Sequence, residues 1–322
     1  MTSALIIRPS SLGDIVHAMP IVHDLARHCP GIAIDWVAEE TFVGLIALNP
    51  GIRRVSPVAL RRWRHHLPSR ATWREFGAFR RRLVADRYTA VIDLQEQVKG
   101  ALLARMARGP VHGPDRASIR EPAATLAYHR RHRIDPAQHL IDRCRQLAGA
   151  TFGFEPEGPP RFDLVPPPNH DGPTARYVVF LHATSRADKL WPDSSWKTLI
   201  EHFTTAGLTV VLPWGSTDEA ARSHALAKAS SQTLVPLHRS VQDLAGLLSH
   251  AELVVGVDTG LVHLAAALDV PTVALFVATD PRLAGVERAS MRALDLGGIG
   301  VAPTPEDVIA AAGRLLRDAP GC

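Results

Sequence analysis

A polar turn, Asp258-Thr259-Gly260, and His263 one helical turn later are the residues of this chain best suited to bind an anion. They follow an apolar run, 253–257, that predicts a buried strand, and they open a segment, 261–268, with the composition of a helix. Backbone N–H groups at such a helix start lack partners within the helix, and the helix dipole adds partial positive charge there. The turn therefore predicts an anion site at the carboxyl end of a strand. The alternative interpretation is a capped helix with a surface histidine.

Each residue of this turn has a property that an anion site can use. Asp258 is predicted to cap the helix, Thr259 adds a hydroxyl group, and Gly260 lets a ligand approach the backbone closely. His263 is predicted to lie on the same helix face. A single polar turn is weak evidence, so the prediction depends on the loops that follow the neighbouring strands.

Polar loops follow three more predicted strands of the same sheet, namely residues 182–192, 214–219 and 278–281. Loops at the carboxyl ends of parallel strands share one edge of the sheet, where they would form a ligand cleft. Lys189 and the helix start at Gly260 are suited to hold a diphosphate, and Glu219 is suited to accept hydrogen bonds from ribose or sugar hydroxyls. Since no Asp-x-Asp metal motif lies nearby, we expect protein groups to stabilise a leaving diphosphate without a metal ion.

A carboxylate near the N-terminus, Asp14, allows two interpretations. It ends a polar loop, 9–14, that follows a short predicted strand, 5–7, and precedes a predicted helix, 15–27. In the first interpretation Asp14 is the N-cap of that helix. In the second it is a general base at the carboxyl end of the strand. No G-x-G-x-x-G sequence follows the strand, which disfavours a dinucleotide-dependent oxidoreductase.

Arginine is concentrated between residues 61 and 87, where nine arginines stand against two acidic residues. The apolar residues of 74–84 recur at helical spacing, so the arginines could be no more than the solvated face of a helix. Trp63 and Trp73 among them favour contact with an anionic lipid headgroup or a bulky phosphorylated substrate. A second basic cluster covers residues 128–133. A nucleic-acid partner is disfavoured because the sequence holds no recognisable nucleic-acid-binding module.

The chain is long enough for two domains. Its 322 residues, 46% of them hydrophobic, suit two cores of ordinary size. Proline-rich segments at 158–160 and 166–173 place the boundary near residue 170, and strand and helix patterns alternate on both sides of it. The alternation predicts an α/β fold with two Rossmann-like doubly wound domains, residues 1–170 and 171–304.

Composition narrows the class of protein. A net charge of only +4 argues against a protein that coats polyanions in general. The three cysteines share no short spacing, which predicts neither a zinc site nor a disulfide framework and fits a reducing cytosol. The N-terminus lacks a signal-peptide layout, and no apolar run approaches the ~18 residues of a spanning helix, so any membrane contact is expected to be peripheral.

Several segments resemble the bacterial lipopolysaccharide heptosyltransferases, and most closely the heptosyltransferase I branch of that family. They are PSSLGDIVH at 9–17, DWVAEE at 35–40, RRWR at 61–64, AVID at 90–93, REP at 120–122, FLHATSRADKLWP at 180–192, LPWG at 212–215 and VDTGLVHL at 257–264. They occur in order across nearly the whole chain, and several are too long to arise by chance.

The resemblance implies a GT-B fold, with two Rossmann-like domains facing a central cleft. The first domain, 1–170, would bind the Kdo sugars of Kdo2-lipid A, and the second, 171–304, would bind ADP-L-glycero-β-D-manno-heptose. The last helix, about residues 305–318, would pack back on the first domain. The implied reaction is heptose transfer with inversion at the anomeric centre and with no cofactor or metal. The enzyme would be cytoplasmic and peripheral on the cytoplasmic side of the inner membrane.

The resemblance also implies roles for particular residues. Asp14 would be the base that deprotonates the acceptor hydroxyl, and Lys189 would assist catalysis by pairing with the leaving diphosphate. The donor would be bound by Thr184, Ser185, Lys189, Glu219, Asp258, Thr259, Gly260 and His263. The acceptor would be bound by Ser10, Ser11, Arg61, Arg62, Arg64 and Arg120.

The sequence departs from the family at two positions and leaves other functions open. Ser185 stands where relatives often have threonine, which keeps the hydroxyl, and Arg239 stands where relatives can have methionine, near the expected adenine contact. The alternatives are a related heptosyltransferase that extends an already heptosylated core, a nucleotide-sugar-binding protein without turnover, and a nucleotide-sugar epimerase. Asp14 together with the complete donor set argues against a binding protein without turnover.

Overall fold

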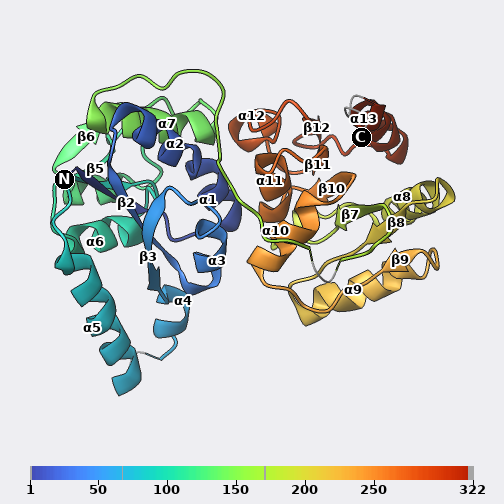
Figure 1. Cartoon of the computed structure of the whole chain (residues 1–322), viewed down its shortest axis with the longest axis horizontal. Helices are drawn as coiled ribbons and strands as arrows, with labels where there is room; N and C mark the ends of the chain where they lie inside the picture. Colours follow the sequence, from blue (N-terminus) through green and yellow to red (C-terminus); the bar gives the residue numbers. More distant parts are fainter. Residues whose placement is uncertain (1, 67, 170–171, 318–322) are drawn as a thin grey trace. The chain divides into compact units, whose positions relative to one another are not determined.

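The computed structural model describes residues 2–66, 68–169 and 172–317. They divide into two compact units, the first ending at Val165 and the second beginning at Pro166. The observed boundary therefore lies at the start of the proline-rich segment 166–173, close to the predicted boundary near residue 170. Each unit has its own sheet (Figure 1). Each also has its own hydrophobic core.

A six-stranded parallel sheet forms the centre of the first unit, in the order β3-β2-β1-β4-β5-β6. Its strands are β1 (Ser3–Ile7), β2 (Ala33–Glu39), β3 (Ile52–Val58), β4 (Ala90–Asp93), β5 (Val111–Pro114) and β6 (Arg130–His132). Its helices are α1 (Leu12–Ala18), α2 (Pro20–His28), η1 (Glu40–Phe42), α3 (Val43–Ile46), α4 (Leu60–Trp63), α5 (Arg70–Ala85), α6 (Val98–Met106), η2 (Pro122–Ala127) and α7 (Leu140–Phe152). Helix α7 packs against α1 and α2, whereas α5, α6 and η2 share a hydrophobic cluster with β1, β2 and β4.

The second unit repeats this plan with the strand order β12-β11-β10-β7-β8-β9. Its strands are β7 (Tyr177–Leu181), β8 (Thr209–Val211), β9 (Thr233–Leu234), β10 (Leu253–Val257), β11 (Thr272–Phe276) and β12 (Ala293–Gly297). Its helices are η3 (Ala187–Lys189), α8 (Asp193–Thr205), α9 (Thr217–Ala227), α10 (Val241–Ser249), α11 (Gly260–Ala267), α12 (Pro281–Ala284) and α13 (Pro305–Arg317).

The central strands are buried along their whole length and mostly apolar because helices cover both faces of each sheet. All five residues of β1, and all five of β10, are buried. Gly256 in β10 permits close packing against β7, since a Cβ atom there would lie 2.9 Å from the Leu181 Cβ atom. Within the described ranges, the helices are too short or too polar to cross a membrane.

The last helix, α13, is part of the core of the second unit. Val308, Ala311, Ala312 and Leu315 are buried in the same hydrophobic cluster as residues of β7, β10 and β11. The helix packs against α8, β11 and β12. The expectation that it packs back on the first domain is therefore wrong, because its apolar face is used within the second unit. Residue 318, the expected end of this helix, lies outside the described residues.

Candidate functional site

Two groups of predicted site residues lie where the strand order of each sheet reverses. In each unit the chain builds one half of the sheet outward from its first strand and then returns to build the other half. Ligands of open α/β sheets bind beyond the carboxyl ends of the strands at such a reversal. It falls between β1 and β4 in the first unit and between β7 and β10 in the second.

In the second unit, polar side chains from three loops meet at Asp258. The Lys189 Nζ atom lies 2.5 Å from Asp258 Oδ2, and the Thr279 hydroxyl donates to the same oxygen at 2.6 Å. His263 Nε2 lies 3.4 Å from the other carboxylate oxygen. Thr184, in the loop after β7, donates its hydroxyl to the Asp258 backbone carbonyl at 3.2 Å. Three of the four loops predicted to share a sheet edge are therefore in contact.

These hydrogen bonds keep Asp258 ionised. Burial by itself would raise the pKa of Asp258, but hydrogen bonds from His263, Lys189 and Thr279 lower that pKa well below the usual carboxyl range. Only 17% of the Lys189 side chain and 14% of the Asp258 side chain are exposed, so salt screens the pair weakly. The cluster thus holds a lysine ammonium in a fixed position beside the turn that opens α11.

The turn itself differs from the prediction in one detail. Thr259, and not Asp258, is the N-cap of α11, and Gly260 is the first helical residue. The Asp258 carboxylate instead accepts hydrogen bonds from the lysine, threonine and histidine side chains. The first backbone N–H groups of α11 have no acceptors within the helix, and both Thr259 and Gly260 are half-buried. Lys189 and the start of α11 together supply the positive charge that a diphosphate requires.

Ser185 belongs to the same loop as Thr184 and Lys189, whereas Glu219 belongs to helix α9. Ser185 is exposed and directly follows Thr184 in the loop after β7. Glu219, in the first turn of α9, accepts a hydrogen bond from the Gly215 backbone N–H at 2.7 Å. This contact fixes the turn after β8, a role that the sequence does not indicate.

Arg222 of α9 fixes the shape of loop 182–191. Its guanidinium donates to the backbone carbonyls of His182, at 2.6 Å, and Trp191, at 2.9 Å. These two carbonyls mark the two ends of the loop. The Trp191 indole N–H in turn donates to the Pro303 carbonyl at 2.9 Å, ahead of α13. The role of Arg222 is not predictable from the sequence, because an arginine within a helix carries no sign of which distant carbonyls it will reach.

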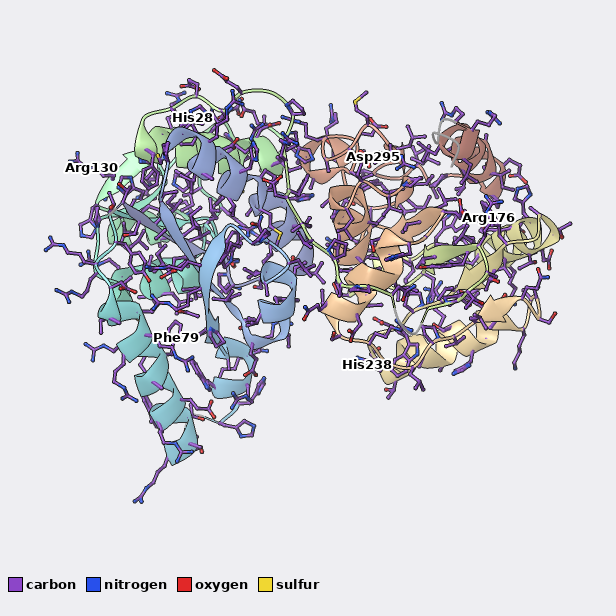
Figure 2. The ribbon with its side chains drawn as sticks, viewed as in Figure 1. His28, Phe79, Arg130, Arg176, His238 and Asp295 are labelled. Carbon is purple, nitrogen blue, oxygen red and sulfur yellow. The ribbon has the colours of Figure 1, made fainter. Side chains whose placement is uncertain are left out.

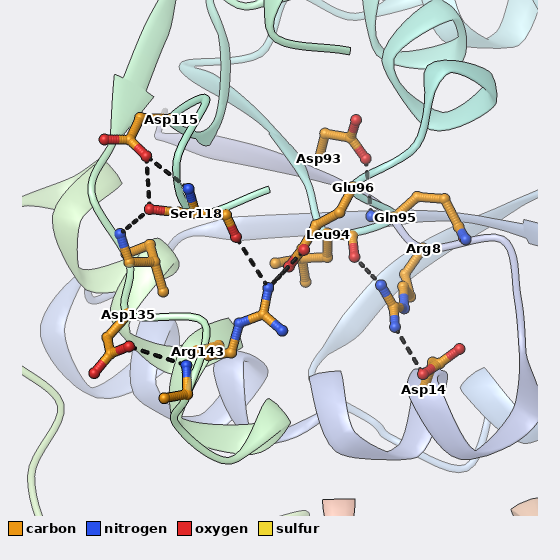
Figure 3. Close-up of polar contacts among 12 residues, drawn as sticks. Arg8, Asp14, Asp93, Leu94, Gln95, Glu96, Asp115, Ser118, Asp135 and Arg143 are labelled. Atoms are coloured by element: carbon orange, nitrogen blue, oxygen red, sulfur yellow. Dashed lines mark hydrogen bonds and ion pairs between the residues drawn. The ribbon is translucent and has the colours of Figure 1, made fainter. Parts of the chain in front are cut away.

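In the first unit, Asp14 lies in the first turn of α1 and pairs with Arg8 at the end of β1. The Arg8 Nη2 atom lies 2.9 Å from Asp14 Oδ1. Ser11 donates its backbone N–H and its hydroxyl to Asp14 Oδ2 at 2.9 and 2.8 Å. Figure 3 shows the same guanidinium donating to the Leu94 carbonyl after β4. Ser11 is the N-cap of α1 and Asp14 occupies the third helical position, so the N-cap interpretation of Asp14 is wrong.

Asp14 is ionised and accessible. Burial favours its neutral form, but the charge of Arg8 and the hydrogen bonds from Ser11 and Arg8 lower the pKa of Asp14 below its usual value. Its side chain is 36% exposed. Asp93 contrasts with it, because complete burial raises the pKa of Asp93 to about 7 although the Tyr128 hydroxyl donates to it at 2.8 Å. Of these two carboxylates, Asp14 is the one that can meet a substrate.

Arg8, which is 5% exposed, is a second site residue that the sequence motifs do not predict. The available signal is its position, since it is a charged residue directly after the apolar strand residues 5–7. A guanidinium that is buried at a strand end must find acceptors there. Arg8 finds them in Asp14 and Leu94, on both sides of the strand reversal.

The predicted acceptor residues are spread over several segments of the first unit. Arg61, Arg62, Arg64 and Arg120 are exposed, and Ser10 is buried. Arg62 is partly neutralised, since its guanidinium lies 3.0 Å from Glu40 and 2.9 Å from Glu75. Ser11 is engaged by Asp14, and the Ser10 N–H donates to the Gln95 side chain at 3.3 Å.

Helix α5 has features of both interpretations of the arginine-rich segment, the solvated helix face and the surface for an anionic partner. Phe79, which Figure 2 labels, and Leu83 are residues of α5 that are buried in the core of the first unit. Arg74 and Arg80 to Arg82 are exposed, as expected for a solvated helix face. Trp73 is also exposed, by 61%, which leaves an aromatic ring among these arginines on the surface.

Two doubly wound parallel sheets, each with polar groups at its strand reversal, define an α/β fold of the GT-B type. Solved structures of this type match nearly the whole chain. The structure described as E. coli heptosyltransferase WaaC with ADP has a TM-score of 0.90 and 37% identity, covering 98% of this chain and 100% of that one. The structure of the same enzyme with ADP-2-deoxy-2-fluoro heptose has a TM-score of 0.86 and 36% identity, covering 97% and 99%.

The chain belongs to glycosyltransferase family 9 (heptosyltransferase), and residues 76–298 match that family. A curated relative, lipopolysaccharide heptosyltransferase 1 of Salmonella typhimurium, is 41% identical over 285 residues, which cover 87% of this chain and 90% of the relative. The chain is therefore a glycosyltransferase. The family and the paired α/β fold indicated by the sequence motifs are confirmed.

Proposed function

We propose that this protein transfers L-glycero-D-manno-heptose from ADP-heptose to the Kdo of Kdo2-lipid A during assembly of the lipopolysaccharide inner core. The observation that carries the proposal is the Lys189–Asp258 pair beside the start of α11, in a chain 41% identical to a lipopolysaccharide heptosyltransferase 1. This position suits a diphosphate. The similar E. coli structures are described as containing ADP and an ADP-heptose analogue.

In this proposal the second unit binds the donor. The Lys189 ammonium and the first N–H groups of α11, with Thr259 and Gly260, pair with the diphosphate, and Asp258 holds Lys189 and His263 in position. The sugar and ribose hydroxyls are hydrogen-bonded by the hydroxyls of Thr184 and Ser185 and by the carboxylate of Glu219. As the bond from the anomeric carbon to the phosphate oxygen breaks, negative charge grows on the diphosphate. The same cationic groups stabilise that charge, so no cofactor or metal ion is required.

Asp14 is the proposed base of the first unit. A Kdo hydroxyl oxygen bonds to the anomeric carbon of heptose while ADP departs with the electron pair of the broken bond. The hydroxyl proton passes to the Asp14 carboxylate, which Arg8 and Ser11 orient. Attack on the face opposite to ADP inverts the anomeric centre, and no covalent sugar–enzyme intermediate forms.

The acceptor carries several negative charges, which suit the exposed guanidinium groups of the first unit. We assign Arg61, Arg62, Arg64 and Arg120 to the Kdo carboxylates and lipid A phosphates. We also assign Ser10 and Ser11, in the loop before Asp14, to the Kdo hydroxyls. The enzyme would work at the cytoplasmic side of the inner membrane, attached peripherally.

A product assay tests the proposal. Purified protein is incubated with ADP-heptose and Kdo2-lipid A, with and without EDTA, and in parallel with an already heptosylated acceptor. We expect transfer to Kdo2-lipid A with release of one ADP per heptose, unaffected by EDTA.

Each alternative function gives a different result in this assay. Transfer confined to the heptosylated acceptor would assign the protein to a later step of core assembly. Donor binding without ADP release would make it a binding protein, and conversion of the donor in the absence of any acceptor would make it an epimerase. Loss of transfer on addition of EDTA would refute the metal-free mechanism.

Arg222 gives a prediction about donor binding. We expect Arg222→Lys to raise the donor KM about tenfold with little change in kcat, because an ammonium group cannot bridge both loop carbonyls as a guanidinium does. Transfer kinetics at varied donor and acceptor concentrations would measure this, and the acceptor KM should not change. The matched control is Arg176→Lys, at an arginine of the same unit that Figure 2 labels. Arg176 pairs with Glu252 at 2.8 Å. An unchanged donor KM in Arg222→Lys would show that loop 182–191 keeps its shape without the guanidinium.

A further inference from the structure

Three large apolar side chains are exposed on the first unit and take no part in the proposed chemistry. Val98 and Leu102 of α6 are 40% and 61% exposed, and Leu126 of η2 is 83% exposed. Val98 and Leu102 are four residues apart, so they share one face of α6. Because η2 packs against α6, Leu126 belongs to the adjoining element. We refer to these three residues as the α6–η2 surface.

Packing within the unit does not account for the α6–η2 surface. The core-facing side of α6 is supplied by Gly100, Ala101, Leu103 and Ala104, all of them buried. A single exposed leucine needs no explanation, but a group of exposed apolar side chains on adjoining elements indicates a binding surface.

The charges around the α6–η2 surface indicate the kind of partner. Lys99 and Arg105 of α6 are exposed, and so is Arg120, two residues before η2. Neither helix contains an acidic residue. Glu121, between Arg120 and η2, accepts the Val98 backbone N–H at 2.9 Å, which ties the two elements together. Apolar side chains bordered by lysine and arginine suit an anionic phospholipid bilayer.

We infer that the α6–η2 surface docks on an anionic phospholipid bilayer, with Leu102 and Leu126 entering the boundary between headgroups and acyl chains. The inference rests on the proposed function, in which Arg120 contacts the charged head of a lipid acceptor. An enzyme that reacts with that head while the acyl chains stay in the bilayer must meet the bilayer beside its acceptor residues. Arg120 lies two residues before η2, so the residues that contact the head and those that contact the bilayer would be close together in the chain.

Vesicle sedimentation with the full-length protein tests this inference. We expect the protein to bind vesicles of phosphatidylcholine and phosphatidylglycerol more tightly than vesicles of phosphatidylcholine alone. The double variant Leu102→Gln/Leu126→Gln should bind the anionic vesicles about tenfold more weakly, because it removes apolar area that enters the bilayer without changing charge. The double variant Leu102→Phe/Leu126→Phe should retain binding.

The matched control is Met291→Gln in the second unit, where the side chain is 98% exposed, and it should bind vesicles like the unaltered protein. Equal binding of the glutamine double variant, or no vesicle binding by the unaltered protein, would overturn the inference. Self-association that the double variant abolishes, without vesicle binding, would assign the surface to a protein partner instead.

A second measurement separates this inference from the proposed function. With a Kdo acceptor that lacks acyl chains, the glutamine double variant should transfer heptose at the rate of the unaltered protein. Vesicle binding without heptose transfer by the unaltered protein would refute the proposed function and leave the bilayer contact standing. Slow transfer to the soluble acceptor by the double variant alone would show that the substitutions disturb the acceptor residues, and this would overturn the assignment to the bilayer.

Discussion

Replacing Asp14 by asparagine should reduce heptose transfer by about 10²- to 10⁴-fold, the usual contribution of a positioned general base. The amide cannot accept the proton of the Kdo hydroxyl, but it has nearly the size of the carboxylate and can still accept a hydrogen bond from Ser11. Donor affinity should not change, because the proposed donor residues all belong to the second unit. Calorimetry with ADP-heptose and a product assay with Kdo2-lipid A measure the two effects separately.

The controls for Asp14→Asn separate the loss of the base from a loss of stability, because Asp14 also belongs to the first turn of α1. Loss of the ion pair with Arg8 could loosen the first unit, so the urea midpoint of each variant should accompany its rate. Ser11→Ala is the matched variant, because it removes one hydrogen bond to Asp14 Oδ2 and leaves the carboxylate. We expect this variant to lose far less activity. An Asp14→Asn protein that is folded and transfers heptose near the normal rate would remove Asp14 from the mechanism.

The lowered pKa of Asp14 has a further consequence for the same assay. A base whose pKa lies below the ordinary carboxyl value of 3.8 is deprotonated throughout the neutral range. The kcat/KM of the unaltered protein, which reports ionisation of the free enzyme, should therefore show no loss from Asp14 until the pH falls below that value. An acidic limb near neutral pH would indicate a different base.

Replacing Lys189 by alanine should weaken ADP binding by about 10- to 100-fold, as expected for a hydrogen bond between charged groups. The loss has two sources. The ammonium no longer pairs with the diphosphate, and the Asp258 carboxylate, which Lys189 contacts at 2.5 Å, is left to repel it. Calorimetry with ADP measures the effect without an acceptor.

Two variants make the Lys189 experiment specific. Lys197→Ala removes an exposed lysine of α8 in the same unit and should leave ADP affinity unchanged. The double variant Lys189→Ala/Asp258→Asn should bind ADP better than Lys189→Ala alone, because the uncompensated carboxylate is gone. Equal ADP affinity in Lys189→Ala and the unaltered protein would refute the assigned role.

Burial explains which elements could be predicted from the sequence. The run 253–257 matches β10 because a central strand covered on both faces is apolar throughout. Strand β6 was not predicted, since its residues Arg130–His132 are charged or polar and it lies at the sheet edge. Only its pairing with β5 makes it a strand. Strand β9 has two residues, too few to show any periodicity.

The sequence predicted which residues are candidates for the site better than it predicted the hydrogen bonds between them. Asp14, Lys189 and Asp258 are recognisable because polar residues follow apolar strands in a repeated pattern. Arg8 and Arg222 act on backbone carbonyls that only the folded chain brings near them, so no local pattern identifies their role. The exposure of Leu102 in α6 could not be predicted either, because the sequence VKGALLARM does not distinguish its buried from its exposed apolar residues.

The hydrogen bond from Trp191 to Pro303 connects loop 182–191, which we propose binds the nucleotide, to the segment just before α13. Loop 182–191, which bears Lys189, is hydrogen-bonded to the residues just before α13. Helix α13 itself packs against the sheet of its own unit. We therefore expect a deletion or fusion that disturbs the segment ahead of α13 to weaken nucleotide binding. This effect would occur although α13 contributes no group to the substrate in the proposed reaction.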